Sequence, residues 1–243
     1  EGGFKLADRA VVVAGHSLGE YSALAAAGAF GIAQAARLLK LRGQAMQKAV
    51  PPGAGSMAAL LGCEMALALE ICAEAAPAPG GGSEVIEAGN DNGGGQVVIS
   101  GATAAVERAI VIAPTKGVRR AMKLPVSAPF HCAMMAPAAD VMAEALRASP
   151  PLSPMVPVVA NVSAAKATDP NEIIDLLVKQ VTATVRWREC MLAMAALGVD
   201  SFVELGSGKV LSGLVKRIAP EASGVNAGTP GEIEALLKLL QGA

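Results

Sequence analysis

The strongest chemical signal in the sequence is the pentapeptide Gly15-His16-Ser17-Leu18-Gly19, which lies between an apolar β-branched run and an apolar helical pattern. A serine in a G-x-S-x-G turn between a strand and a helix forms a nucleophile elbow. We expect the strand at Ala10–Ala14 and a turn so tight that both flanking positions require glycine. Ser17 would then lie at the positive end of the next helix, with the Leu18 N–H aimed at a developing oxyanion. The alternative, a glycine turn with an incidental serine, is disfavoured by this context.

A serine hydroxyl needs a base, and the only histidines are His16 and His131. His16 adjoins Ser17, and neighbouring side chains on an elbow point apart, so His131 is the predicted base. The two prolines in the segment 125–132 would rigidify its approach. An acid usually orients such an imidazole, but between Ser17 and His131 only Asp91 is a candidate. A neutral acceptor is therefore the alternative.

Arg42 is the next residue with chemical meaning. It lies on a predicted helix, Ile32–Val50, among the leucines Leu38, Leu39 and Leu41. An arginine on an apolar helical face suggests a buried anionic partner, and its fork could hold a carboxylate through two hydrogen bonds. A surface arginine with its stem along the apolar face is the alternative.

Composition excludes several classes of protein. Of the 243 residues 53% are hydrophobic and 17% charged, so the chain can bury a sizeable core. The formal net charge of −1 excludes a polycation built for nucleic acid. One Trp, one Tyr and four Phe are too few for a stacking platform.

Membrane insertion, secretion and metal binding also find little support. The longest apolar stretch, Tyr21–Leu39, is rich in alanine and contains Arg37, and no signal peptide is visible. The four cysteines form no C-x-x-C pair, and with two histidines a zinc site is not expected. We expect free, mostly buried thiols in a reducing cytosol, and neither a metal nor a cofactor.

The central part of the sequence predicts a separate succession of strands and helices. It predicts an order of strand, helix, strand, strand, helix, strand, typical of a ferredoxin-like unit. We therefore expect residues 53–123 to form a small subdomain inserted into a larger one. Its predicted elements are Ser56–Leu61, Glu64–Ala76, Glu84–Ala88, Gln96–Ser100, Ala102–Ala113 and Val118–Met122.

Residues 1–52 and 124–243 form the predicted larger subdomain. Its helices alternate with short β-branched strands, which favours an α/β fold with a mainly parallel sheet covered on both faces. The predicted helices are Leu18–Ala29, Ile32–Val50, Met134–Leu146, Pro170–Val181, Arg186–Leu197, Gly208–Ile218 and Gly231–Leu240. The predicted strands are Ala10–Ala14, Met155–Asn161, Ser201–Leu205 and a short one from Val225.

Five motifs occur in a characteristic order along the chain. They are Gly15-His16-Ser17-Leu18-Gly19-Glu20-Tyr21, Arg42-Gly43-x-x-Met46-Gln47, Gly93-x-x-Gln96-Val97-Val98-Ile99-Ser100-Gly101, Pro129-Phe130-His131 and Glu204-Leu205-Gly206-x-Gly208-Lys209-Val210-Leu211. In this order they resemble the malonyl-CoA:acyl carrier protein transacylases, over nearly the whole chain. The resemblance implies an α/β-hydrolase-like large subdomain and an inserted ferredoxin-like one.

The resemblance also implies roles for single residues. Ser17 resembles the acyl-accepting nucleophile, His131 its base and Arg42 the residue that grips the malonyl carboxylate. Gln180 resembles a position whose backbone carbonyl orients the histidine. Met46 and Phe130 would line the acyl pocket, with Phe130 crowding the α-carbon. The family's N-terminal loop, G-Q-G-x-Q, whose glutamine N–H is a second oxyanion donor, has no counterpart here, so we expect an N-terminal portion of the fold to be missing from this chain.

The resulting hypothesis is a malonyl transferase that works by a ping-pong mechanism in fatty acid or polyketide synthesis, as a cytoplasmic monomer. Its partners would be malonyl-CoA and acyl carrier protein, with no nucleic acid and no membrane. Since acyl carrier proteins are acidic, we expect a local basic docking patch, with the candidates Arg119, Arg120, Lys123, Lys209, Lys216 and Arg217. Two alternatives remain: a serine esterase or thioesterase, favoured if an acid contacts His131, and an inactive carrier-docking module.

Overall fold

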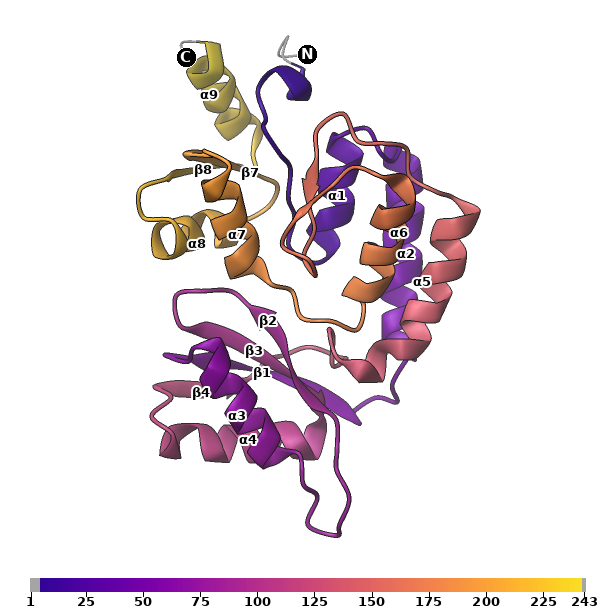
Figure 1. Ribbon diagram of the computed structural model, residues 1–243, viewed down its shortest axis with the longest axis vertical. Helices are drawn as coiled ribbons and strands as arrows, with labels where there is room; N and C mark the ends of the chain where they lie inside the picture. The colour runs from indigo at the N-terminus through magenta and orange to yellow at the C-terminus, as the bar shows by residue number, and fades with distance from the viewer. Residues whose placement is uncertain (1–4, 242–243) are drawn as a thin grey trace.

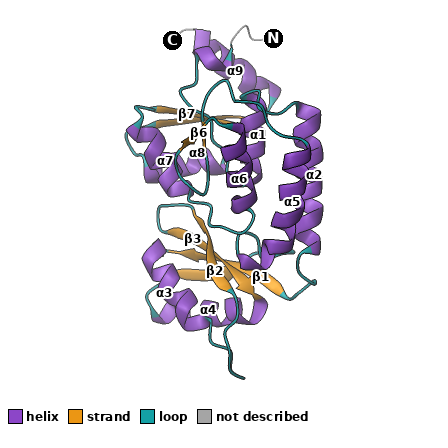
Figure 2. Cartoon of the chain, turned by 45° about the vertical axis from the view of Figure 1, so that its right-hand side comes forward, coloured by secondary structure: helices purple, strands orange, loops and turns teal. Residues whose placement is uncertain are grey.

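The computed structural model describes residues 5–241 (Figure 1). It is a mixed α/β structure in which a four-stranded sheet with two helices occupies one end. Helices and two short strand pairs make up the rest (Figure 2). The first described element is a 3₁₀ turn, Leu6–Asp8, and residues 1–4 lie outside the described part of the chain.

The four-stranded sheet is built from β1 (Gly55–Leu61), β2 (Ile86–Asp91), β3 (Gln96–Ala102) and β4 (Arg120–Lys123). Its strand order is β2-β3-β1-β4, and each neighbouring pair is antiparallel. Helices α3 (Met65–Ala75) and α4 (Thr103–Thr115) follow β1 and β3 in the chain, so the predicted order of elements is confirmed.

The two faces of this sheet have different partners. Side chains such as Leu60 and Ile99 pack with Ile71 of α3 and Val106 of α4 in one buried cluster. The alternate residues of β1 and β3, among them Met57, face the other way and pack against Leu124 and Phe130. This alternation follows the two-residue period of a strand.

A helical layer carries most of the remaining core. It consists of α1 (Leu18–Ala26), α2 (Ile32–Lys48), the 3₁₀ turn Ala133–Met135, α5 (Ala136–Ala148) and α6 (Pro170–Gln180). Their apolar faces bury Leu38, Met142, Leu146 and Leu177 in one cluster. The carboxylate of Asp169 caps α6 by accepting the N–H groups of Asn171 and Glu172, both at 2.9 Å.

The C-terminal part contains α7 (Trp187–Ala196), β7 (Ser201–Leu205), α8 (Val210–Ile218), β8 (Ser223–Ala227) and α9 (Pro230–Gln241). Strands β7 and β8 pair in parallel. The carboxylate of Glu204 accepts the N–H of Ser212 at 2.7 Å and of Leu211 at 3.2 Å, both near the start of α8. Glu204 in the fifth motif therefore satisfies free N–H groups of a helix N-terminus.

Two predictions about the sheet are wrong. The run Ala10–Ala14 is no buried strand, since only Val13 forms a bridge, to Val158, and Val11 is 60% exposed. The predicted strand Met155–Asn161 shrinks to β5 (Val158–Val159), which pairs antiparallel with an unforeseen β6 (Lys166–Ala167). β-Branched residues favour extended backbone whether or not a neighbouring strand pairs with them, so sequence alone overstates the sheet.

The expectation of a mainly parallel sheet fails for the same reason. Within residues 5–241 the only parallel pairings are β7 with β8 and two isolated bridges, Val13 with Val158 and Asn90 with Val185, and the largest sheet is antiparallel. Other elements match within a few residues, and β7 matches the predicted strand Ser201–Leu205 at both ends.

The remaining structural expectations concern membranes, thiols and metals. In the part of the chain that the structure describes, no helix has the length and apolarity to cross a bilayer. The stretch Tyr21–Leu39 is divided between α1 and α2 by a turn at Gly28, whose φ is 79°. All four cysteines are buried and free of disulfides. Residues 5–241 hold no cluster of three or more His, Cys, Asp or Glu side chains arranged for a metal ion.

Candidate active site

The turn before α1 forces Ser17 into an unusual backbone conformation. Ser17 is the N-cap of α1, with φ 53° and ψ −110°. A β-carbon on Gly15 would lie 1.9 Å from the carbonyl oxygen of Gly19, so this position requires glycine. At Gly19 a β-carbon would meet no atom within 4 Å. The expectation that both flanks are too tight for a side chain is therefore wrong for Gly19, because the chain passes close to the turn on one side only.

The predicted base is in place beside the serine. The Ser17 hydroxyl and His131 Nε2 are 2.7 Å apart, and His131 Nδ1 lies 2.9 Å from the carbonyl oxygen of Gln180. A carbonyl oxygen can only accept, so Nδ1 carries the proton and Nε2 is free to accept the serine proton. The neutral acceptor inferred from the sequence is thus the Gln180 carbonyl.

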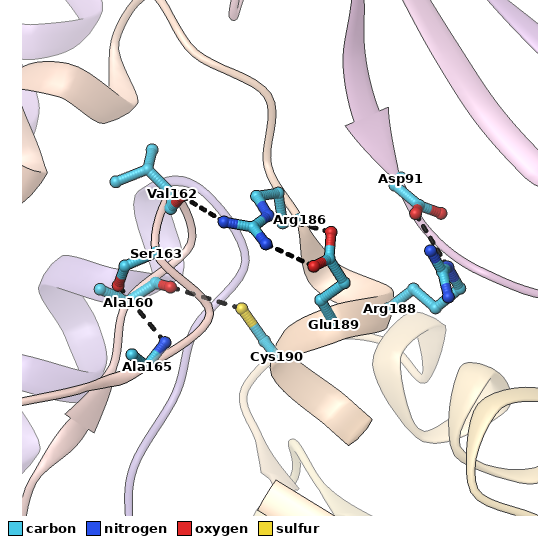
Figure 3. A network of polar contacts seen from close by, with 9 residues as sticks. All are labelled: Asp91, Ala160, Val162, Ser163, Ala165, Arg186, Arg188, Glu189 and Cys190. Carbon is cyan, nitrogen blue, oxygen red and sulfur yellow. Dashed lines mark hydrogen bonds and ion pairs between the residues drawn. The ribbon is translucent and has the colours of Figure 1, made fainter. Parts of the chain in front are cut away.

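Asp91, the alternative acid, is engaged elsewhere. Its carboxylate pairs with Arg188 at 2.9 Å, at the end of β2 (Figure 3). The other histidine is occupied as well, since His16 Nε2 lies 2.8 Å from Asn92 Oδ1 and its ring packs on Trp187. The inference that His16 is a poor base for Ser17 therefore agrees with the geometry.

The environment of His131 keeps its imidazole neutral. Burial, as the largest cause, and the nearby positive charge of Arg42 lower the pKa of His131 to about 3, while the hydrogen bond to Gln180 opposes the shift. A neutral imidazole can act as a general base toward the serine hydroxyl.

Arg42 is buried, with 6% of its surface exposed, so the surface alternative is wrong. Its Nη2 donates to Ser17 Oγ at 3.1 Å and to Gln180 Oε1 at 3.0 Å, and its guanidinium carbon lies 5.9 Å from the centre of the Tyr21 ring. Its Nε is buried without a partner among the described residues. An unpaired buried N–H is costly, so this guanidinium is suited to receive an anionic acceptor.

Two buried residues that sequence reasoning gave no role complete the site. Glu20 Oε2 accepts the N–H of Asn161 at 3.0 Å and Nε2 of Gln180 at 2.9 Å. Burial raises the pKa of Glu20 to about 7, against the lowering effects of these hydrogen bonds and of Arg42. Glu20 stood in the first motif but without a role. Asn161 had no signal beyond its place at the end of a predicted strand.

The other predicted site residues lie close in sequence to Ser17, Arg42 and His131. The Leu18 N–H opens α1 and meets no acceptor among the described residues, as the first N–H groups of a helix normally do. Met46, one turn beyond Arg42, is buried in the helical core, and Phe130, next to His131, is half-buried between that core and the sheet.

The predicted docking residues divide into two groups. Arg119 packs on Gly62, whose N–H bonds to Gly95, and Arg217 packs its Cβ and Cδ on Gly94. Arg217 therefore lies on the turn between β2 and β3, and Arg119 lies next to it through Gly62. Arg120 and Lys216 adjoin these two arginines in sequence. Lys123 is paired with Glu107 at 2.8 Å, and Lys209 lies at the opposite end of α8 from Arg217. The structure does not gather all the candidates into one patch.

A serine paired with a neutral histidine, beside a buried arginine and on an α/β fold, defines the class of serine-dependent acyl-transfer enzymes. Residues 7–229 match the family model described as "Acyl transferase domain". The chain belongs to this family.

The names of individual similar proteins specify the acyl group and its acceptor. The chain is 45% identical over 228 residues to the "Malonyl CoA-acyl carrier protein transacylase" of Escherichia coli strain K12, covering 94% of this chain and 72% of that protein. A crystal structure of an acyl-carrier-protein S-malonyltransferase from Bartonella henselae is 50% identical with a TM-score of 0.93, over 98% of this chain and 74% of the other. A malonyl-transacylase solved in complex with a type II polyketide acyl-carrier protein is 40% identical with a TM-score of 0.89, over 94% and 72%.

The elbow predicts opposite effects for its two glycines. Gly15→Ala should lower the melting temperature clearly, since its β-carbon would collide with the Gly19 carbonyl. Gly19→Ala should leave the melting temperature unchanged or raise it, because alanine favours a helix by up to about 1 kcal/mol over glycine. Thermal unfolding of the two variants checks this, and equal destabilisation would contradict the one-sided packing.

The pH dependence of Ser17 reactivity follows from the neutral form of His131. Because the lowered pKa keeps the base deprotonated below 6.5, the rate of labelling by a sulfonyl fluoride should stay constant from about pH 8 down to about pH 5. Arg42→Ala removes a nearby positive charge, so it should move the acid-side fall of the rate to higher pH. A wild-type rate that falls with an apparent pKa near 6.5 would rule out the buried neutral imidazole.

Proposed function

We propose that the protein transfers a malonyl group from malonyl-CoA to the phosphopantetheine thiol of acyl carrier protein, through a malonyl-serine intermediate. The observation that carries this proposal is the guanidinium of Arg42, which is buried 3.1 Å from the Ser17 hydroxyl and whose Nε has no partner within residues 5–241. A substrate whose acyl group ends in a carboxylate supplies the missing acceptor. The names of the similar proteins point to the same reaction, which would supply fatty acid or polyketide synthesis.

The first half-reaction begins with the Ser17–His131 pair. His131 Nε2 takes the hydroxyl proton while Ser17 Oγ attacks the thioester carbonyl of malonyl-CoA. The Leu18 N–H donates to the tetrahedral oxyanion at the N-terminus of α1. The carbon–sulfur bond then breaks, and the departing CoA sulfur takes the proton back from His131.

The second half-reaction runs the same steps in reverse order with a new thiol. His131 accepts the proton of the phosphopantetheine thiol, whose sulfur attacks the malonyl-serine ester. The carbon–oxygen bond to Ser17 breaks, and Oγ recovers its proton from His131. Neither half needs a cofactor, because coenzyme A and the carrier thiol are the two leaving and entering groups.

Arg42 also couples substrate binding to the base. In the free protein its positive charge depresses the pKa of His131. A carboxylate bound to Arg42 offsets that charge, so the imidazole becomes a stronger base when malonyl-CoA is present. An acetyl group would bring neither the anchor nor this effect, and Phe130 beside the base would crowd a branched acyl group.

The two other candidate functions find less support. A serine esterase was favoured only if an acid contacted His131, and the group found there is the backbone carbonyl of Gln180. An inactive carrier-docking module has no use for a serine held 2.7 Å from a neutral histidine.

The chain divides between two units in this proposal. Residues 1–52 and 124–243 form an α/β-hydrolase-like subdomain that carries Ser17, Arg42, His131 and Gln180. Residues 53–123 form an inserted ferredoxin-like subdomain. Separate apolar clusters in the helical layer and beneath the four-stranded sheet support this division.

The carrier protein would dock over the turn between β2 and β3. Arg217 lies on this turn, Arg119 lies next to it through Gly62, and the exposed Arg120 follows Arg119 on the edge strand β4. The same turn reaches the elbow through Asn92, which contacts His16 next to Ser17. Although the Glu64 carboxylate also lies at this turn, the arginines here would attract an acidic carrier toward the nucleophile.

The proposed reaction is tested by mixing the protein with malonyl-CoA and mapping the adduct by mass spectrometry. We expect one malonyl ester, on the peptide that contains Ser17, and none in the folded Ser17→Ala variant. Malonylation of the variant at another residue, or hydrolysis of malonyl-CoA without an adduct, would overturn the proposal.

The role of Arg42 predicts a change in acyl selectivity. A charge-assisted contact contributes about 1.5–3 kcal/mol, so Arg42→Ala should lower kcat/KM for malonyl-CoA relative to acetyl-CoA by about ten- to a hundred-fold. Arg42→Lys keeps the positive charge but lacks the two-pronged guanidinium, so its ratio of kcat/KM for malonyl-CoA to that for acetyl-CoA should lie between those of wild type and Arg42→Ala. If kcat/KM for both thioesters falls equally in Arg42→Ala, the arginine does not recognise the carboxylate.

The docking face predicts an effect on one half-reaction only. Arg119→Glu combined with Arg217→Glu should raise the KM for acyl carrier protein by about ten-fold at low salt, with acylation by malonyl-CoA unchanged. Lys209→Glu, at the other end of α8, is the matched control and should leave both half-reactions unchanged. If the double variant has the same KM for acyl carrier protein as this control, the carrier does not dock on this face.

A further inference from the structure

The start of α1 matches a helix-capping pattern that the structure does not use. In an S-x-x-E capping box the serine side chain accepts the N–H of the third helical residue, and the glutamate accepts the N–H of the serine. Ser17 and Glu20 have this spacing, yet Ser17 makes no side-chain cap, and its hydroxyl lies against His131 instead. Glu20 points to Asn161 and Gln180. The side chains of Ser17 and Glu20 therefore both form contacts within the candidate active site and do not cap the helix.

Other side chains hold the backbone of Ser17 in their place. Asn161 Oδ1 accepts the Ser17 N–H at 2.7 Å, and Gln180 Nε2 donates to the Ser17 carbonyl oxygen at 3.0 Å. The amide of Asn161 also donates to the Gly15 carbonyl at 2.9 Å. A serine at φ 53° persists only where its surroundings over-determine it, and these contacts clamp it on both sides.

One carboxylate oxygen joins the two clamps. Glu20 Oε2 accepts the backbone N–H of Asn161 and the side-chain amide of Gln180, and Glu20 is 1% exposed. The same Gln180 presents its Oε1 to Arg42 and its backbone carbonyl to His131. Ser17, His131 and Arg42 are thus all held by one hydrogen-bond network, in which Asn161 and Gln180 are joined through Glu20.

The loop that carries Asn161 is itself braced by α7 (Figure 3). Arg186 donates from its N–H to the Asn161 carbonyl and from Nη1 to the Val162 carbonyl, both at 3.0 Å. The Cys190 thiol donates to the carbonyl of Ala160. Glu189 holds the Arg186 guanidinium from the same helix. Asn161 is therefore presented to the elbow by a fixed frame.

We propose that Glu20 and Asn161 are positioning residues for the reaction at Ser17, acting as hydrogen-bond partners that hold the strained nucleophile in register with His131 and Arg42. What Glu20 must supply is an acceptor at the Oε2 position, and what Asn161 must supply is an acceptor for the Ser17 N–H. Where malonyl-CoA is the acyl donor, the proposal rests on the proposed function.

Matched variants of Glu20 separate positioning from burial. The amide oxygen of Glu20→Gln can accept both N–H groups, whereas Glu20→Met has similar length and no acceptor. We expect Glu20→Gln to keep the acylation rate constant within about threefold of wild type and Glu20→Met to lose at least about ten-fold, with KM for malonyl-CoA changed less. Ile71→Val is the control for lost stability, because Ile71 is buried between α3 and the four-stranded sheet, in a cluster whose described members include no residue of the candidate active site. It should lower the melting temperature without changing the acylation rate constant.

Single-turnover acylation by malonyl-CoA and labelling of Ser17 by a sulfonyl fluoride should rank the variants in the same order, well below each melting temperature. The proposal would be overturned if Glu20→Met reacted at a rate within twofold of wild type. It would also be overturned if Glu20→Gln reacted as slowly as Glu20→Met. A wild-type protein that reacts with the sulfonyl fluoride but not with malonyl-CoA would refute the proposed function, and the labelling order would still decide this proposal.

Asn161→Ser provides the test if Glu20→Met does not fold. Its side chain is too short to reach both the Ser17 N–H and the Gly15 carbonyl, so acylation and labelling should slow by about ten-fold while KM stays within about threefold. Rates equal to wild type in this folded variant would contradict a positioning role for Asn161.

Discussion

The site depends on a positive charge that the fold keeps away from water. A guanidinium in the interior is tolerated only when it is paired or well hydrogen-bonded, because its desolvation costs more than a single contact returns. Arg42 has Gln180 and Ser17 as acceptors, the Tyr21 ring at 5.9 Å and the carboxylate of Glu20 in its surroundings. This arrangement leaves Nε without an acceptor among the described residues, and we propose that this buried N–H recognises an anionic acyl group.

The same positive charge, second to burial, also affects the protonation state of the Ser17–His131 pair. Burial and Arg42 both keep His131 neutral, and the Gln180 carbonyl fixes its proton on Nδ1. A carboxylate in the orienting position, as in many serine hydrolases, would stand as a second anion near Arg42 and compete with the substrate for it. A neutral carbonyl orients the histidine without that competition. The choice of acceptor for the histidine and the choice of substrate are therefore linked through one arginine.

The sequence predicted what short-range pattern controls. The elbow at Ser17 and the order of elements over residues 53–123 follow from local spacing and periodicity. His131 follows by elimination between two histidines, and the sequence leaves open whether Arg42 is buried or on the surface. The sequence failed where partners come from distant segments. The run Ala10–Ala14 has the composition of a strand but finds one bridge, and Asn161 and Glu20 gain their roles only because the fold brings residues 141 positions apart into contact. Gln180 was reached through its family resemblance, since a backbone carbonyl leaves no trace in side-chain chemistry.

We infer that the buried Arg42 binds the free carboxylate of the acyl group on Ser17. A crystal structure of the malonyl-serine form, trapped without carrier protein, tests it directly. We predict that the malonyl carboxylate accepts hydrogen bonds from Arg42, including its previously unpaired Nε, while His131 keeps its contact with the Gln180 carbonyl. A malonyl carboxylate bound by other groups, with Arg42 still bonded to Gln180 and its Nε unpaired, would contradict the account.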